Sequence, residues 1–412
     1  MKRRRSLTHV GGAVETAGDR DVAARLAAAL DVAPAPEPRG SVSENDDPDR
    51  SHVHGFHTYP ARMHPVTARR LVEAVSTASA TVLDPFCGSG TVLVEAMIAG
   101  RRAVGTDLNP LAVMLARLKT SALDEAGCAA LLAAAREVSA FASERRLRRA
   151  GATRRYPPED VALFDPHVLL ELDSLRAGVA GRPEAGVTEA LGLVLSAILV
   201  KVSRRASDTS GRETARRIAA GYTSRLFVRK TEELVRRLTV LRGLLPAGAP
   251  PAHVALDDAT RLRTMKASTV DAVVTSPPYA GTYDYVAQHA LRMRWLGIDT
   301  HAFAEGEIGS RRRYAMLDAP TARSAWGREL GAALRAMARV CRKGARAALV
   351  MADSGARGEA LRADVIVAEE ARAAGFDFVA RASQTRPHFH GETAGAFRDV
   401  PRAEHAIVIE KR

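Results

Sequence analysis

The sequence predicts an α/β protein built on a Rossmann-like, mostly parallel sheet, with one antiparallel strand near its C-terminal end and a helical insertion. Two observations carry this prediction. Short β-branched apolar runs, each typical of a buried strand, occur in the first third of the chain and again after residue 252. The stretch between them, residues 119–251, has the apolar spacing of helices and therefore interrupts the sheet.

The first expected strand leads into a glycine turn. Residues 81–83 are β-branched and apolar, Gly88 and Gly90 permit a tight turn with positive φ, and residues 91–99 have helical spacing. Such a strand, turn and helix bring a ligand close to bare backbone and direct free N–H groups at its negative end.

A second strand, residues 102–106, ends on Asp107, whose carboxylate can accept hydrogen bonds from two ribose hydroxyls. A plain tight turn, a phosphate loop and a dinucleotide fold are alternatives, but GxGxxG spacing and a following Gly-Lys-Ser/Thr are both absent. Asp84 would repel a pyrophosphate and can hold an ammonium. The predicted cofactor is S-adenosylmethionine, with candidate binding residues Asp84, Phe86, Gly88, Gly90, Thr91 and Asp107.

A second motif follows the expected strand 270–274. Two prolines stiffen the backbone after Ser276, so the Ser276 hydroxyl and the Pro277 carbonyl present acceptors to an incoming amine. The Tyr279 ring can stack on a planar base. A proline turn that merely closes a buried strand is the alternative. The two motifs together predict a methyl-donor site and an amine-acceptor site.

Asp84 to Thr91 resembles the cofactor motif of the amino-methyltransferases of nucleic acid, and Ser276 to Tyr279 resembles their catalytic motif. The resemblance implies a class I methyltransferase sheet with Ser276, Pro277, Pro278 and Tyr279 as catalytic residues. Because the serine form of the motif is typical of it, the resemblance also implies methylation of N4 of cytosine in a flipped-out DNA base.

The resemblance extends beyond the two motifs. Residues 56–65 are similar to the family segment that closes over the methionine end of the cofactor, which makes Tyr59 a further cofactor-binding candidate. Residues 284–297 look like the helix after the catalytic motif in a bacterial branch of site-specific DNA methylases, and residues 207–210 and 386–391 are recurring pieces without an assigned role. The resemblance covers residues 52–118 and 252–410.

Composition shifts predict the domain organisation. Residues 1–51 are expected to form a flexible basic and polar tail, with one Ala-rich helix near 20–31. Residues 52–118 and 252–412 would form the methyltransferase domain, and residues 119–251 a helical insertion that is the candidate target-recognition region. The strand 253–258 would place Asp258, chosen over Asp257, where it can accept from the cofactor adenine amine. Further strands are expected at 345–351, 376–382 and 404–410, the last pair antiparallel.

The charge favours a nucleic-acid partner. The 412-residue chain carries a formal net charge of +13, and each phosphate that it neutralises would release a counterion. We expect DNA, with RNA as the weaker candidate and an Arg-rich compositional bias as the alternative explanation. The apolar run 190–200 is shorter than a membrane span, and three unpaired cysteines predict a reducing, cytoplasmic location.

Two basic clusters are candidates for nucleic-acid contact. Arg204 and Arg205 precede the turn at 207–210, although a solvated helix face explains them equally well. Arg311, Arg312 and Arg313 stand beside an aromatic residue after the catalytic motif, as expected of a segment near the mouth of the site. The histidines at 52, 54, 57 and 64 lack a second cluster at ligand spacing, so no metal is expected.

Three other functions compete with this prediction. Adenine-N6 methylation of DNA would need only a larger pocket. Methylation of guanine N2 in tRNA is suggested because related enzymes share the Asp-Pro-Phe-Cys-Gly-Ser-Gly turn at residues 84–90. A non-catalytic nucleic-acid-binding subunit would retain the fold. A cognate restriction endonuclease is a candidate partner, and the oligomeric state is left open.

Overall fold

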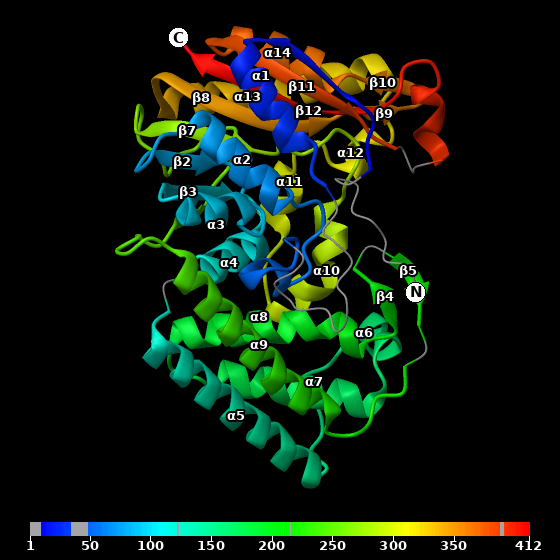
Figure 1. Ribbon diagram of the computed structural model, residues 1–412. Helices are drawn as coiled ribbons and strands as arrows, with labels where there is room; N and C mark the ends of the chain where they lie inside the picture. Colours follow the sequence, from blue (N-terminus) through cyan, green and yellow to red (C-terminus); the bar gives the residue numbers. More distant parts are fainter. Residues whose placement is uncertain (1–9, 34–47, 122, 209, 215, 388–390) are drawn as a thin grey trace.

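The computed structural model describes residues 10–33, 48–121, 123–208, 210–214, 216–387 and 391–412. Its centre is an eight-stranded sheet in the order β1-β11-β12-β8-β7-β2-β3-β6 (Figure 1). The five strands from β8 to β6 run parallel, and β12 is antiparallel to both β8 and β11. The expected mostly parallel α/β sheet with an antiparallel C-terminal strand is confirmed. The strands of this sheet are β1 (Val14–Gly18), β2 (Thr81–Asp84), β3 (Arg102–Asp107), β6 (His253–Leu256), β7 (Val270–Thr275), β8 (Cys341–Ala352), β11 (Phe376–Thr385) and β12 (Ala403–Lys411).

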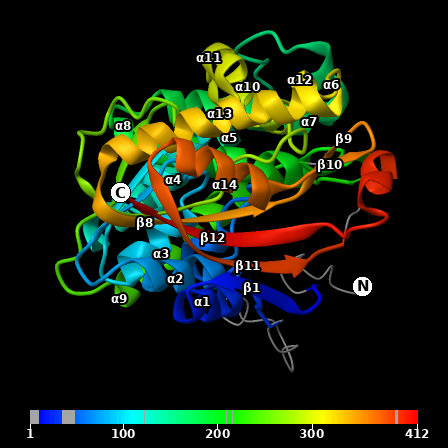
Figure 2. The same cartoon turned by 90° about the horizontal axis from the view of Figure 1, so that it is seen from above.

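Helices cover both faces of the sheet, as Figure 2 shows. Neighbouring strand residues point to opposite faces, so Val82 packs in the core under α1 to α4 whereas Leu83 packs in the core under α13 and α14. The helices of the sheet domain are α1 (Arg20–Leu30), α2 (Pro65–Val75), α3 (Thr91–Ile98), α4 (Pro110–Lys119), α10 (Tyr285–Leu296), α11 (His301–Gly306), α12 (Arg311–Tyr314), α13 (Ala319–Val340) and α14 (Ala363–Ala373). The small hairpin strands are β9 (Ser354–Ala356) and β10 (Glu359–Leu361).

The segment between β3 and β6 is helical apart from one hairpin, β4 (Arg205–Ser207) with β5 (Ser210–Glu213). Its helices pack around their own apolar core and against α4 and α10. They are α5 (Glu125–Leu147), α6 (Pro158–Leu163), α7 (Pro166–Ala180), α8 (Ala185–Leu199) and α9 (Tyr222–Leu244). Residues 185–202 are long and apolar enough to cross a membrane, but 67% of this window is buried in the fold. We therefore interpret α8 as the core helix of the insertion.

The N-terminal segment differs from the flexible tail expected for residues 1–51. Strand β1 pairs antiparallel with β11, and α1 buries Leu26 and Leu30 against α2 and the sheet. The helix near 20–31 was expected, but its docking was not, because β1 is short and mostly exposed and shows no buried-strand pattern. The remainder of the predicted tail, residues 1–9 and 34–47, lies outside the described residues, as do residues 388–390 of the recurring piece 386–391.

Candidate active site

The candidate site lies at the edge of the sheet where β2, β3, β6 and β7 end. Parallel strands bring their carboxyl ends to one edge, so the chain places Asp84, Asp107, Asp258 and Ser276 around the same hollow. A pocket there is lined by Tyr59, Phe86, Gly88, Asp107, Asp258 and Ser276, together with Tyr285 and Phe303. With Pro278, which also lines it, seven residues predicted from the two motifs and the flanking segments thus share one cavity.

The glycine turn has the conformation that its sequence requires. Gly88 and Gly90 have φ of 50° and 85°, and Gly90 is the N-cap of α3. A Cβ on Gly88 would lie 3.3 Å from the Tyr59 ring, so the glycine lets this ring lie close over the turn. Both predicted glycines are therefore needed for backbone shape as well as for ligand approach.

Asp107 is held by two backbone donors. Gly88 N–H and Asn109 N–H each donate to its carboxylate at 2.8 Å. Burial raises the pKa of Asp107 to about 6, against these hydrogen bonds, which favour the charged form. The carboxylate also lines the pocket, so its remaining acceptor positions are available for ribose hydroxyls.

Asn109 was not predicted from the sequence as a site residue, although the Asn109-Pro110 pair is a helix-start signal. Its side-chain oxygen caps α4 by accepting from Leu111 N–H at 3.0 Å, and its amide donates to the Tyr59 hydroxyl at 3.3 Å. The Tyr59 ring stacks on buried His289, with the ring centroids 4.8 Å apart. Tyr59 is consequently fixed over the cofactor pocket from two sides.

Asp84 lies in a deeper recess that Tyr59, Phe86, Gly88, Thr91 and Ser276 also line. Thr275 Oγ1 donates to Asp84 at 2.6 Å and Phe86 N–H donates at 3.1 Å. Burial raises the pKa of this carboxyl to about 7. An ammonium in the recess would stabilise the ionised form and lower that pKa again.

The residues of this edge fit S-adenosylmethionine. Thr91 Oγ1, at the first turn of α3, is buried and has no hydrogen-bond partner in the described part of the chain. A ligand carboxylate there would also meet the positive end of the helix. Asp84 suits the amino group and Asp107 the ribose. Asp257 is occupied by Thr264, which donates at 2.7 and 2.6 Å, whereas Asp258 faces the pocket. The choice of Asp258 agrees with this placement and stays a prediction.

Ser276, Pro277 and Tyr279 line a second pocket beside the first. Pro278 instead lines the cofactor pocket, and its carbonyl accepts from Trp326 Nε1 at 3.2 Å, which fixes the turn from behind. A hydrogen bond joins the Ser276 and Tyr279 side chains, and burial raises the pKa of the Tyr279 hydroxyl far above its ordinary value. The tyrosine thus remains protonated and can act as a hydrogen-bond donor.

The second pocket has polar and aromatic walls from distant parts of the chain. Among the lining residues that the sequence analysis did not assign to it are Tyr283, Tyr285, Arg386, Arg402 and Glu404. Arg386 is buried, donates to Glu404 at 2.9 Å and joins β11 to β12 at the pocket. In the sequence, only its position in the recurring piece 386–391 pointed to Arg386, and no function could be assigned to that piece.

In the two arginine clusters, all residues except the partly buried Arg205 are exposed, and Arg204, Arg312 and Arg313 form ion pairs. Arg312 contacts Asp284 at 2.7 Å and Glu307 at 3.1 Å, and Arg313 contacts Glu329 at 2.6 Å. Arg311 lines a third cavity, which shares Tyr283 and Arg402 with the second pocket. Arg204 contacts Asp165 at 2.8 Å and lies with Arg205 at the β4–β5 hairpin. Their role in nucleic-acid binding stays a prediction.

With this geometry in place, the chain can be compared with known proteins. Residues 35–117 match the DNA methylase family model, N6_N4_Mtase. This segment contains β2, β3, the glycine turn, Tyr59, Asp84 and Asp107. The similarity therefore covers the cofactor half of the site, and S-adenosylmethionine is the cofactor that the segment binds.

The chain also resembles individual known proteins. The chain is 39% identical over 75 residues to the type II methyltransferase M.MvaI of Kocuria varians, which is 18% of this chain and 16% of that protein. It is 44% identical over 52 residues to the tRNA (guanine(10)-N2)-dimethyltransferase of Methanothermobacter thermautotrophicus, which is 12% of this chain and 16% of that protein. Among solved structures, the rRNA methyltransferase aviRa of Streptomyces viridochromogenes covers 86% of this chain and 88% of its own at 15% identity and a TM-score of 0.30. The chain thus spans about a sixth of the length of each of these two methyltransferases, M.MvaI and the tRNA enzyme.

Proposed function

We propose that the protein is an S-adenosylmethionine-dependent DNA methyltransferase that acts on the exocyclic N4 amine of cytosine. The observation that carries this proposal is the position of Ser276, which lines the cofactor pocket, the recess beside Asp84 and the second pocket. An amine bound to Ser276 from the second pocket would lie next to the methionine end of a cofactor bound to Asp84. The family match over residues 35–117 and the serine form of the catalytic motif support the proposal.

The residues of the second pocket have the chemistry that an amine acceptor requires. The Ser276 hydroxyl and the Pro277 carbonyl accept hydrogens of the amine, and the Tyr279 ring stacks on the base. S-adenosylmethionine supplies the methyl group on a positively charged sulfur, and the acceptor nitrogen loses a proton as the N–C bond forms and the C–S bond breaks. Alignment of amine and methyl contributes roughly 7 to 11 kcal/mol when the geometry is favourable.

A base must leave the double helix to reach this pocket. Flipping costs a few kcal/mol, which phosphate contacts and stacking on Tyr279 would offset. Arg311 at the adjoining cavity and the β4–β5 hairpin with Arg204 and Arg205 are the proposed DNA contacts. We also propose that the helical insertion recognises the target sequence. The proposed location is the cytoplasm, and the proposed partner is a cognate restriction endonuclease.

One alternative has an observation in its favour. The chain is 44% identical over 52 residues to a tRNA (guanine(10)-N2)-dimethyltransferase, which supports an RNA methyltransferase as a second candidate. Adenine-N6 methylation and a non-catalytic binding subunit are the remaining alternatives. Adenine-N6 methylation would change only the base that binds in the second pocket. A non-catalytic subunit would bind the cofactor but would not transfer the methyl group.

The test is to incubate purified protein with tritiated S-adenosylmethionine and separate pools of duplex DNA, single-stranded DNA and tRNA, and to identify the methylated nucleoside by mass spectrometry. We expect N4-methyldeoxycytidine. Ser276→Ala and Tyr279→Ala should each lower the rate by about 10²-fold or more, because the amine loses its alignment. Tyr279→Phe keeps the ring and should retain most of the rate, and Ser324→Ala, on the exposed side of α13, is the matched serine control.

Each other product selects a different function. N6-methyldeoxyadenosine as the product would show that the substrate base is adenine and not cytosine. Label in tRNA would identify an RNA methyltransferase. Cofactor binding without transfer to any pool would favour the non-catalytic subunit.

A further inference from the structure

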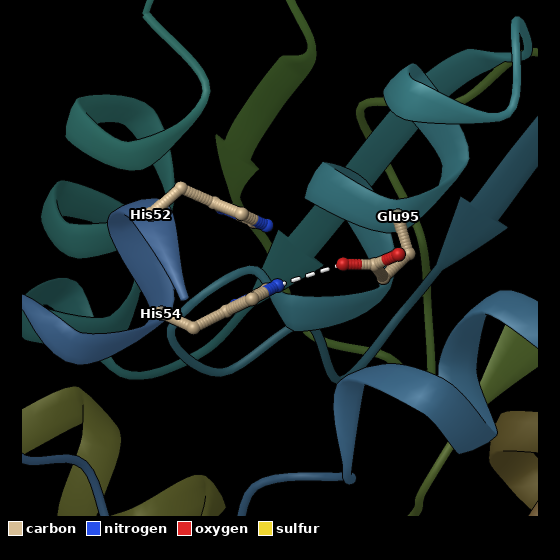
Figure 3. A group of neighbouring side chains, drawn as sticks. All are labelled: His52, His54 and Glu95. Carbon is tan, nitrogen blue, oxygen red and sulfur yellow. Dashed lines mark hydrogen bonds and ion pairs between the residues drawn. The ribbon is translucent and has the colours of Figure 1, made fainter. Parts of the chain in front are cut away.

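A buried cluster of two histidines and one glutamate lies behind the cofactor turn. His52 and His54 belong to the 3-10 helix η2 (His52–Gly55), and Glu95 projects from α3 (Figure 3). His54 Nε2 lies 2.8 Å from Glu95 Oε1, and the two imidazole centroids are 4.6 Å apart. One potential metal ligand atom from each residue lies within 4.8 Å of the other two.

The histidines lack the hydrogen bonds that buried polar groups normally make. His52 is 7% and His54 0% exposed, yet Nδ1 of both rings has no hydrogen-bond partner among the residues that the structure describes. The His52 ring has no hydrogen bond to any of the described residues. Burying such groups without partners costs free energy. His52 also has a backbone φ of 31°, a conformation that residues other than glycine adopt at a cost in free energy.

We propose that His52, His54 and Glu95 form a binding site for one divalent transition-metal ion of the zinc class. Two imidazole nitrogens and one carboxylate oxygen are ligands that zinc prefers, with bond lengths of roughly 2.0–2.2 Å. With these bond lengths, two ligand atoms on a tetrahedral ion lie roughly 3.3–3.6 Å apart. The three ligand atoms all lie within 4.8 Å of one another, so the side chains would move closer together around an ion. A fourth position would be filled by water or another donor.

The neighbouring basic groups are directed elsewhere. Arg237 donates to the backbone oxygens of Arg50 and His52 at 2.7 and 2.6 Å. Arg69 lies 3.8 Å from Glu95 Oε2, which leaves Oε1 on the histidine side. Lys119 binds Ser89 Oγ at 2.9 Å, and burial lowers its pKa well below the ordinary value, which favours its neutral form.

A metal ion here would link two parts of the cofactor site. Helix η2 leads into the segment that holds Tyr59, and α3 begins at the glycine turn. The other described group of this kind, Asp353, Asp364 and His405, is a weaker candidate, because Asp353 lies 2.9 Å from Arg362 and Asp364 is paired with Arg381. The proposal does not depend on the methyl acceptor.

The experiment measures metal directly. Full-length protein is stripped with a chelator, dialysed and titrated with Zn²⁺, and bound metal is measured by elemental analysis; Co²⁺ is then used as an optical probe. We expect about one ion per chain and the absorption of four-coordinate cobalt. His52→Asn should weaken binding by more than about tenfold. Asparagine tolerates positive φ, and the His52 ring has no hydrogen bond to lose within the described part of the chain, so this variant should fold.

Two further variants complete the design. Glu95→Gln should weaken zinc binding to a similar extent, and His301→Asn, which alters a histidine 77% exposed on α11, should bind as the unchanged protein does. Zinc should raise the melting temperature of the unchanged protein and of His301→Asn, but not that of His52→Asn. Equal zinc uptake by the unchanged protein and a folded His52→Asn/Glu95→Gln variant would overturn the proposal, as would no uptake by the unchanged protein.

Discussion

At the residue scale, Asp84 and Asp107 differ in how deeply their strands bury them. Asp84 is 3% exposed and Asp107 is half-buried at the pocket wall. Burial raises the pKa of both, to about 7 and about 6 respectively. In the proposed complex, a cofactor ammonium would therefore compete with a proton for Asp84 near pH 7, where an ordinary aspartate is already ionised.

The first prediction concerns the pH dependence of cofactor affinity. S-adenosylmethionine should bind with full affinity above about pH 7, where Asp84 is ionised, and lose affinity as the pH falls through the pKa of Asp84. Below it the loss should approach about tenfold per pH unit, with a further loss from Asp107 below about pH 6. Calorimetric titration between pH 5.5 and 8 measures this.

Two variants separate Asp84 from its neighbours. Asp84→Asn should bind the cofactor more weakly and with a flatter pH profile, whereas Asp258→Asn should bind more weakly with the profile unchanged. An affinity that does not vary with pH in the unchanged protein would contradict the assignment of the ammonium to Asp84.

Sequence alone makes these carboxylates candidates because their signals are local. A β-branched run, an acidic residue at its end and a glycine turn all lie within about ten consecutive residues of the motif. The second pocket is different. Arg386, Arg402 and Glu404 reach it only because β11 and β12 return to the sheet beside β8. The sequence predicts the strands at 376–382 and 404–410 and their antiparallel pairing, but nothing in it indicates that Arg386, Arg402 and Glu404 line the pocket.

At the element scale, Arg292 on α10 joins three segments that are distant in sequence. Its guanidinium binds Asp208 after β4 at 2.9 and 2.7 Å, the Ser196 carbonyl on α8, and His57 at 3.2 Å. Arg292 is 1% exposed. The helix after the catalytic motif is thereby fastened both to the hairpin of the insertion and to the segment that holds Tyr59.

The second prediction is that Arg292→Ala lowers the free energy of unfolding by about 3–5 kcal/mol, because it leaves the Asp208 carboxylate buried without its partner. Urea unfolding followed by circular dichroism measures this. The matched control is Arg323→Ala, which removes an ion pair with Glu369 between side chains 42% and 57% exposed. That variant should change stability by no more than about 1 kcal/mol. Similar losses for the two variants would show that the Arg292 network contributes no special stability.

At the scale of the whole molecule, β1 and α1 of the segment expected to be a tail are part of the fold. Helix α1 buries five residues, Val22, Ala23, Leu26, Ala29 and Leu30, on one face. Its polar neighbours and the proline-rich stretch that follows dominate the composition of residues 1–51. Composition averaged over a segment conceals a single amphipathic helix, which explains why the docking was not predicted.

The third prediction tests this docking. Leu26→Ala removes a fully buried side chain between α1, α2 and the sheet, and should lower the free energy of unfolding by about 2–5 kcal/mol. Arg25→Ala, at an exposed position of the same helix, should stay within about 0.5 kcal/mol of the unchanged protein. Thermal unfolding measures both. If Leu26→Ala is as stable as Arg25→Ala, α1 does not contribute to the stability of the fold.

The pairing of β1 with β11 also determines when the protein can finish folding during its synthesis. The Gln384 side chain donates to the Gly12 carbonyl across a separation of 372 residues, so β1 leaves the ribosome long before its partner strand exists. Until then the apolar face of α1 has no sheet to cover, and such exposed faces promote aggregation. Nascent chains that stall before residue 376 would therefore be the species most in need of chaperones.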